Sequence, residues 1–151
     1  GAKNLIVPAG GHRKPCNLNT KREKIFNDGV YRSEENLFMN GSELFNFTLK
    51  AVPESVSKLL SKKQIKIEDV DFFVFHQANK FILENLRRKI EIPKEKFCVN
   101  LFYYGNTVSS TIPMALELAF KQNAIKNGHR ILLSGFGVGY SWASVIIKCS
   151  F

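Results

Sequence analysis

The chain has 151 residues, enough for one domain with a buried core, and its 44% hydrophobic and 23% charged residues are ordinary for a globular protein. No apolar run approaches the ~18 residues that span a bilayer and no secretory signal opens the sequence, so we expect no membrane association. The formal net charge of +9 favours acidic partners such as nucleic acid, anionic lipid or an acidic protein, although a lysine-rich solvated surface would explain it as well.

The first 36 residues contain scattered glycines, prolines and charges and only one short apolar run, Leu5–Val7. This pattern predicts a strand remnant followed by a long loop. A loop of this length is unusual inside a compact domain unless it packs against something else. We therefore treat residues 1–36 as a leading segment.

Helical spacing of apolar residues begins after Ser42, which is a reasonable N-cap. Pro53 lies inside this pattern and removes one backbone donor, so we expect a kink or break there. Asp71–Phe75, which is apolar after its first residue, is a run of the kind that forms a doubly buried strand. Helical spacing returns from Asn79 to Ile90.

The second part of the chain alternates strands and turns around one more helix. Further strands are predicted at Phe97–Phe102, Arg130–Ser134 and Ser141–Lys148, a helix from Ser109 or Ser110 to about Asn123, and a glycine-rich bend at Gly135–Gly139. The order α-β-α-β-α-β-β predicts an α/β fold with helices packed on a mixed sheet and the last two strands antiparallel.

Two polar residues stand where apolar strands end. His76 follows the run at 71–75, and Asn106 lies in the turn Gly105–Thr107. Each residue alone is more often structural, but both precede a helix and could face the same rim of the sheet. An imidazole and a carboxamide placed together are plausible donors for a developing enolate oxygen.

The bend Gly135–Gly139 leads into a strand rather than a helix, which excludes a dinucleotide-binding loop. Its amides could serve an oxyanion, or it could be a plain hairpin turn. The three cysteines, Cys16, Cys98 and Cys149, are odd in number and widely spaced, which favours a reducing cytoplasm over a disulfide framework. None has the helix N-terminus or cationic neighbour of a reactive thiolate.

Three motifs together resemble one family. His76-Gln-Ala-Asn79, Tyr104-Gly-Asn-Thr107 and Gly135-Phe-Gly-Val-Gly-Tyr-Ser-Trp142 look, in this order and spacing, like the C-terminal half of β-ketoacyl-acyl-carrier-protein synthase III. The resemblance implies the C-terminal half of a thiolase-like fold over residues 37–151. It also implies that an N-terminal half with the nucleophilic cysteine is absent from this chain, and that the complete enzyme is a homodimer.

The family is an acyltransferase of fatty-acid or related acyl biosynthesis. The resemblance implies that a cysteine takes an acyl group from acyl-coenzyme A, that malonyl-carrier protein loses carbon dioxide, and that the resulting enolate attacks the acyl thioester. It implies coenzyme A and acyl-carrier-protein thioesters as substrates, no resident cofactor and a cytoplasmic location. This chain alone would be inactive.

The resemblance also implies roles for single residues. His76 and Asn106 match the His and Asn of the family's Cys-His-Asn triad. The further matches are Phe136 and the Val138 amide at the active-site wall and oxyanion, Phe45 and Asn79 in the pantetheine tunnel, and Arg88 and Lys89 in docking of the acidic carrier protein.

The alternative is a non-catalytic basic module that binds an acidic carrier protein or another polyanion. Nucleic-acid binding lacks any recognisable motif. His12, His76 and His129 do not cluster with cysteines at metal-ligand spacing, so no metal site is predicted.

Overall fold

The computed structural model describes residues 1–26, 28–102, 104–137 and 139–150. The chain divides into two compact units, one formed by residues 1–44 with the bend before Ser141 and one formed by the rest. The elements are β1 (Leu5–Ile6), α1 (Leu18–Lys21), β2 (Lys24–Ile25), β3 (Tyr31–Arg32), β4 (Phe38–Met39), α2 (Gly41–Lys63), η1 (Ile67–Asp69), β5 (Phe72–Phe75), α3 (Lys80–Ile90), η2 (Lys94–Lys96), η3 (Val108–Ser110), α4 (Thr111–Lys121), β6 (Arg130–Gly137) and β7 (Ser141–Lys148).

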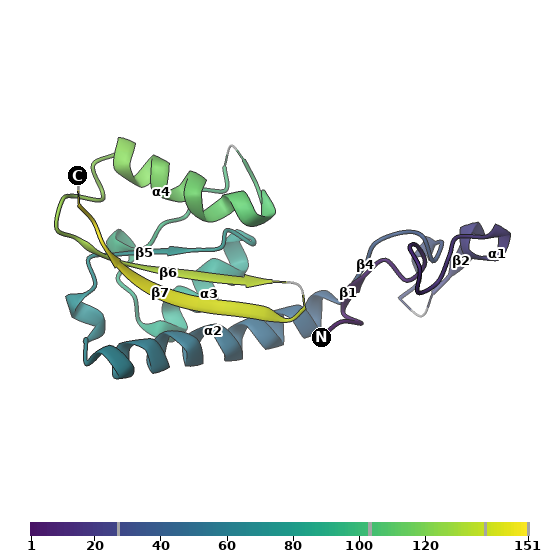
Figure 1. The fold of residues 1–151 in the computed structure, drawn as a ribbon, viewed down its shortest axis with the longest axis horizontal. Coiled ribbons are helices and arrows are strands. Elements are labelled where there is room, and N and C mark those ends of the chain that lie inside the picture. Colours follow the sequence, from purple (N-terminus) through teal and green to yellow (C-terminus); the bar gives the residue numbers. More distant parts are fainter. Residues whose placement is uncertain (27, 103, 138, 151) are drawn as a thin grey trace. The chain divides into compact units, whose positions relative to one another are not determined.

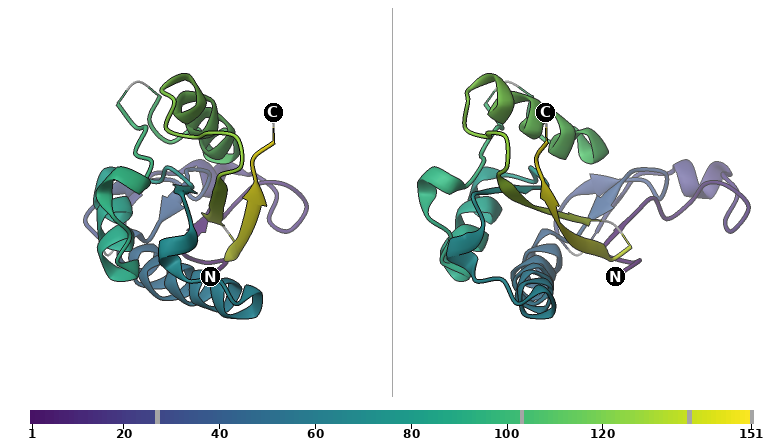
Figure 2. Two further views of the ribbon diagram at one scale, coloured as in Figure 1. Left: turned by 90° about the vertical axis from the view of Figure 1, so that its left-hand side faces the viewer. Right: turned by 60° about the vertical axis from the view of Figure 1, so that its left-hand side comes forward.

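The larger unit is a three-stranded mixed sheet in the order β5-β6-β7. β5 runs parallel to β6 and β6 runs antiparallel to β7, which confirms the predicted mixed sheet and its antiparallel final pair. α4 covers one face of the sheet, and α2 and α3 cover the other (Figures 1 and 2). Among the described residues, no helix combines the length and apolarity that crossing a membrane requires.

Strand β5 is buried on both faces, as its unbroken apolar run predicts. Phe72 and Val74 pack in the cluster with α4, whereas Phe73 and Phe75 pack in the cluster with α2 and α3. Side chains alternate along a strand, so the next residue, His76, continues the face that looks toward α4.

A kink or a break is predicted at Pro53, and helix α2 is continuous across this residue, so it does not break there. The helix buries one face through Val52, Val56 and Leu60, and this packing outweighs the backbone hydrogen bond that proline cannot make. The predicted cap at Ser42 is wrong. The side chain of Asn40 caps the helix instead, because its Oδ1 accepts from the backbone N–H of Glu43 at 3.2 Å.

The strand predicted at Phe97–Phe102 is reduced to one parallel bridge, between Phe73 and Phe97. A side chain replaces the expected ladder: Oε1 of Gln77 accepts from the backbone N–H of Asn100 at 2.7 Å. With that donor satisfied, the segment needs no strand partner at this point.

Strand β6 runs to Gly137 instead of ending at Ser134, so most of the predicted glycine-rich bend is strand. Gly135, Phe136 and Gly137 pair in register with Ala143, Trp142 and Ser141. A glycine in a strand loses only packing and entropy, and the long ladder with β7 supports it.

The smaller unit contains more structure than the strand remnant and long loop predicted for residues 1–36. β1 pairs with β4 and β2 pairs with β3, both antiparallel and two residues long. Helix α1 begins with a reciprocal cap, in which Asn17 and Thr20 each bond the other's backbone N–H. Local turn and cap chemistry therefore gives this segment its structure.

Candidate active site

The ring of His76 is held by the start of α4. Its Nδ1 lies 2.7 Å from Oγ1 of Thr111, and the ring packs edge-on against Phe136 with centroids 5.3 Å apart. Burial lowers the pKa of His76 below its ordinary 6.5, and a hydrogen bond with the backbone of Val108 acts in the opposite direction. Only an acceptor favours a protonated ring, so the group of Val108 that faces the ring is its carbonyl.

The carboxamide of Asn106 lies in the loop before η3 and is exposed. Its Oδ1 accepts from the backbone N–H of Val108 at 2.9 Å, so the NH₂ group is the side of the carboxamide that remains to donate. The carbonyl of Val108 accepts from Oγ1 of Thr111 at 2.9 Å. Asn106 and His76 are therefore joined through the backbone of Val108 and the hydroxyl of Thr111.

Val108 itself has a left-handed backbone, with φ of +56°. This region is costly for a β-branched residue, by about 1–3 kcal/mol. Its N–H and its carbonyl are hydrogen-bonded by Asn106 and Thr111, and these bonds hold the residue in this conformation.

The buried side-chain amide of Gln77 links the end of β5 to the segment around Asn100. Nε2 of Gln77 donates to the carbonyl of Phe75 at 2.7 Å, while its Oε1 accepts from Asn100. Gln77 is 1% exposed, so these bonds are shielded from water. The tie joins the end of β5, which carries His76, to the segment that leads to Asn106.

Thr111, Val108 and Gln77 were not among the predicted site residues. Of these three, only Gln77 could have been inferred from the sequence, because a glutamine that directly follows a buried strand needs hydrogen-bond partners for its side-chain amide. The left-handed backbone of Val108 has no signal in the sequence, since glycine or asparagine is the usual occupant.

The residues predicted for the pantetheine tunnel lie around the start of α3. Asn79 caps this helix, with Oδ1 accepting from Ile82 N–H at 2.8 Å. Phe45 stacks on Phe81 with centroids 5.3 Å apart, and Phe81 is 67% exposed. Phe136 is 9% exposed and lies beside His76, and Val138 lies outside the described residues.

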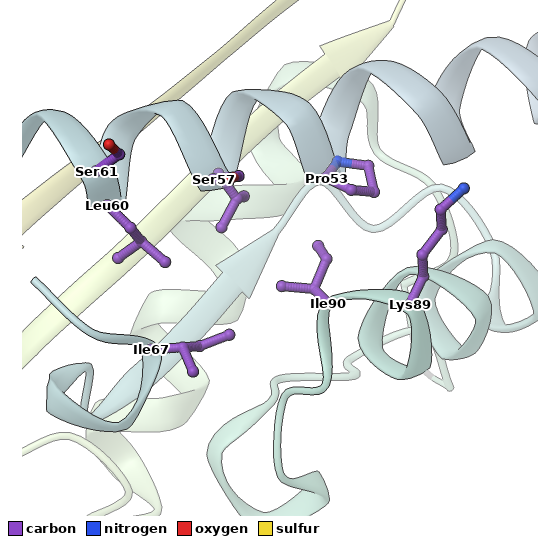
Figure 3. A pocket seen from close by; sticks show the side chains of 8 residues that line it. Pro53, Ser57, Leu60, Ser61, Ile67, Lys89 and Ile90 are labelled. Carbon is purple, nitrogen blue, oxygen red and sulfur yellow. The ribbon is translucent and has the colours of Figure 1, made fainter.

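Arg88 and Lys89, the predicted docking pair, are exposed in the last turn of α3. Lys89 also lines a groove of about 460 Å³, whose wall is formed by α2, η1 and the end of α3 (Figure 3). His76 and Asn106 do not line it.

Cys98 is buried, and burial raises the pKa of its thiol to about 11. A thiol with so high a pKa stays protonated near neutrality, which does not suit a nucleophile. Cys149 is also buried, and Cys16 is exposed. In the described part of the chain, no three His, Cys, Asp or Glu side chains are placed to hold a metal ion.

Known proteins resemble this chain in sequence and in structure. The family described as 3-oxoacyl-[acyl-carrier-protein (ACP)] synthase III C terminal matches residues 60–149. β-Ketoacyl-[acyl-carrier-protein] synthase III of Natranaerobius thermophilus is 40% identical over 150 residues, covering 98% of this chain and 43% of the relative. The same enzyme of Clostridium perfringens is 42% identical over 123 residues, covering 82% of this chain and 38% of the relative.

A crystal structure of a 3-oxoacyl-(acyl-carrier-protein) synthase III superposes with a TM-score of 0.94 at 45% identity, covering 99% of this chain and 44% of that one. This likeness confirms the predicted α/β fold as the C-terminal part of a thiolase-like fold. The chain spans about two-fifths of the length of the relatives it matches. It belongs to the family of 3-oxoacyl-[acyl-carrier-protein] synthase III C-terminal domains.

Proposed function

We propose that this chain supplies the enolate-stabilising half of a decarboxylating condensing enzyme. The complete protein would be an acyltransferase that joins an acyl thioester to malonyl-carrier protein in fatty-acid or related acyl biosynthesis. Its remaining part, an N-terminal half, would carry the cysteine that holds the acyl group. The family match disfavours the alternative of a non-catalytic basic module.

One observation carries this proposal: the hydrogen bonds that run from His76 through Thr111 and Val108 to Asn106. Loss of carbon dioxide places negative charge on the thioester oxygen of the malonyl group. Hydrogen-bond donors fixed before the reaction stabilise such charge without reorganising during it. The NH₂ group of Asn106 and the ring of His76 are the proposed donors.

Partners and setting follow from the same proposal. The acidic carrier protein would dock on Arg88 and Lys89, with the pantetheine arm passing Phe45 and Asn79. Phe136 would form the wall of the site and the Val138 amide would bind the oxyanion of acyl transfer. Acyl-coenzyme A would be the acyl donor, and the enzyme would be a cytoplasmic homodimer without a resident cofactor.

The test uses the complete protein and separates its two half-reactions. His76→Ala and Asn106→Ala should each lower malonyl decarboxylation about 10²–10³-fold, the usual effect of removing one such donor. Acyl transfer from acyl-coenzyme A should stay nearly unchanged, because it uses the cysteine and a different oxyanion site. His12→Ala, at an exposed histidine in the other unit, is the control. Equal loss of both half-reactions would refute the assigned roles.

Docking is tested by charge reversal. Arg88→Glu with Lys89→Glu should weaken carrier binding about tenfold at low ionic strength, and added salt should shrink the difference. The matched control reverses Lys62 and Lys63 at the end of α2. Unchanged carrier affinity in the first double variant would exclude this docking surface.

A further inference from the structure

A side chain opens the parallel ladder beside β5. The backbone N–H of Cys98 donates to the carbonyl of Phe73 at 3.0 Å, as it does in a parallel pair of strands. The next bond in this direction would run from the N–H of Asn100 to the carbonyl of Phe75. The amide of Gln77 lies between these two groups instead, because its Nε2 donates to Phe75 at 2.7 Å and its Oε1 accepts from Asn100 at 2.7 Å.

The orientation of this amide is fixed by its partners. A backbone carbonyl can only accept and a backbone N–H can only donate, so the NH₂ group faces Phe75 and the oxygen faces Asn100. The NH₂ group also lies 3.4 Å from the carbonyl of Cys98. Gln77 is 1% exposed, so water does not compete for these bonds.

The segment anchored in this way leads to Asn106. Leu101 packs against the cluster of α2 and α3, and its carbonyl accepts from the backbone N–H of Gly105 at 3.1 Å. Gly105 has φ of +60°, a conformation that suits glycine, and Asn106 follows it. The place of the Asn106 carboxamide therefore depends on where Asn100 is held.

His76 is fixed on the other side of the same amide. It stands between Phe75 and Gln77, and its backbone N–H donates to the carbonyl of Ser134 at 2.8 Å. We propose that Gln77 is a positioning residue whose inserted amide sets the spacing between the His76 and Asn106 donors. This inference deepens the proposed function and rests on it.

The spacing matters because both donors must reach one thioester oxygen. A misplacement of about 1 Å in a reacting geometry can cost about 100-fold in rate. Without the amide, the N–H of Asn100 and the carbonyl of Phe75 either lose their partners or approach each other to the ~2.9 Å of a direct bond. Either result moves the segment before Asn106 relative to His76.

The first test measures both half-reactions in the complete protein. Gln77→Leu keeps most of the side-chain volume and removes the amide, so kcat of malonyl decarboxylation should fall about 10–100-fold. Acyl transfer from acyl-coenzyme A, and KM for malonyl-carrier protein, should stay within about twofold. Gln122→Leu, at an exposed position, is the control. A folded Gln77→Leu protein with unchanged decarboxylation overturns the proposal, and so does an equal loss of both half-reactions.

Gln77→Glu separates hydrogen bonding from packing. A protonated carboxyl has the shape of the amide, donates through its O–H to Phe75 and accepts from Asn100, whereas a carboxylate cannot donate. Burial raises the pKa of a carboxyl group, so the decarboxylation rate relative to the unmodified protein should be close to one at about pH 6 and fall about tenfold by about pH 9. Taking this ratio at each pH cancels the titration of His76. A ratio that is independent of pH overturns the role of the two bonds, and this profile decides if Gln77→Leu does not fold.

The inference and the proposed function fail separately. If His76→Ala and Asn106→Ala lower decarboxylation selectively but Gln77→Leu does not, the proposed function stands and the inference fails. If the two alanine variants have no selective effect, the proposed function fails, and amide hydrogen exchange still decides whether Gln77 holds Asn100. The N–H of Asn100 should exchange slowly in the unmodified protein and about tenfold faster in Gln77→Leu. Rapid exchange of this N–H in the unmodified protein overturns the link.

Discussion

The unit from Phe45 onward is built on two apolar clusters that sandwich a sheet, whereas the unit of residues 1–44 is held by short strand pairs, a helix cap and charged contacts. In the smaller unit the guanidinium of Arg32 lies 4.2 Å from the ring centroid of Phe26 and 4.9 Å from that of Phe38. Its apolar side chains are often exposed, as in Leu18 at 89% and Tyr31 at 68%. The comparison teaches that burial dominates stability in one unit and local geometry in the other.

The largest effect should come from the core of the larger unit. Phe73→Ala removes a ring that is 0% exposed and should lower the free energy of unfolding by about 3–5 kcal/mol. The matched change in the smaller unit, Leu18→Ala, should stay within about 0.5 kcal/mol because that side chain is 89% exposed. Denaturant titrations measure both, and similar losses would erase the contrast between the units.

A smaller loss should follow from cutting the buried amide tie. Gln77→Leu leaves the carbonyl of Phe75 and the N–H of Asn100 without their partner, at a cost of about 1–3 kcal/mol in unfolding free energy. Gln122→Leu makes the same chemical change at an exposed position and is the control. If Gln77→Leu and Gln122→Leu have the same free energy of unfolding, water replaces the hydrogen bonds of the Gln77 amide.

The cap of α1 should matter only locally. Asn17→Ala removes the acceptor for Asn19 and Thr20 N–H, which typically costs about 1 kcal/mol. Amide hydrogen exchange should rise in residues 17–22 and stay unchanged in β6, with Asn19→Ala as the control. Faster exchange throughout β6 would mean that the two units do not open independently.

The smallest effect belongs to the ion pairs of Glu34. Hydrogen bonds from Lys14 and Lys24 hold the pKa of Glu34 below 4.5. The stabilisation is therefore present above pH 4.5 and is lost as the pH falls through the lowered folded-state pKa. Glu34→Gln should remove this pH dependence and also its sensitivity to salt. Glu23→Gln, for which no ion pair is present among the described residues, is the control.

The contrast between a buried core and local hydrogen bonds also explains which elements the sequence predicts correctly. β5 follows from its unbroken apolar run and α3 from the helical spacing of its apolar residues, because burial selects apolar side chains at those positions. The helix continues through Pro53 because the packing of its buried face outweighs the low helix propensity of proline. The small elements of residues 1–44 depend on individual caps and turns, such as the bond between Asn17 and Thr20, which no period reveals.

At the site, His76 follows a strand as predicted, whereas the strand predicted before Asn106 is absent and Asn106 lies in the loop before η3. The residues that connect them, Val108 and Thr111, could not be predicted from the sequence pattern. Thr111 looks like an ordinary first residue of a helix, and the role of its hydroxyl depends on the backbone angle of Val108.

Because of this backbone angle, a substitution at position 108 should change the stability and the activity of the complete protein in opposite directions. Val108 is 71% exposed with φ of +56°, so glycine there should relieve the strained conformation. The same freedom would loosen the backbone of residue 108, which is bonded to both Asn106 and Thr111. Variants of the complete protein selected for heat tolerance should therefore accept glycine at this position, while variants selected for the activity proposed above should reject it.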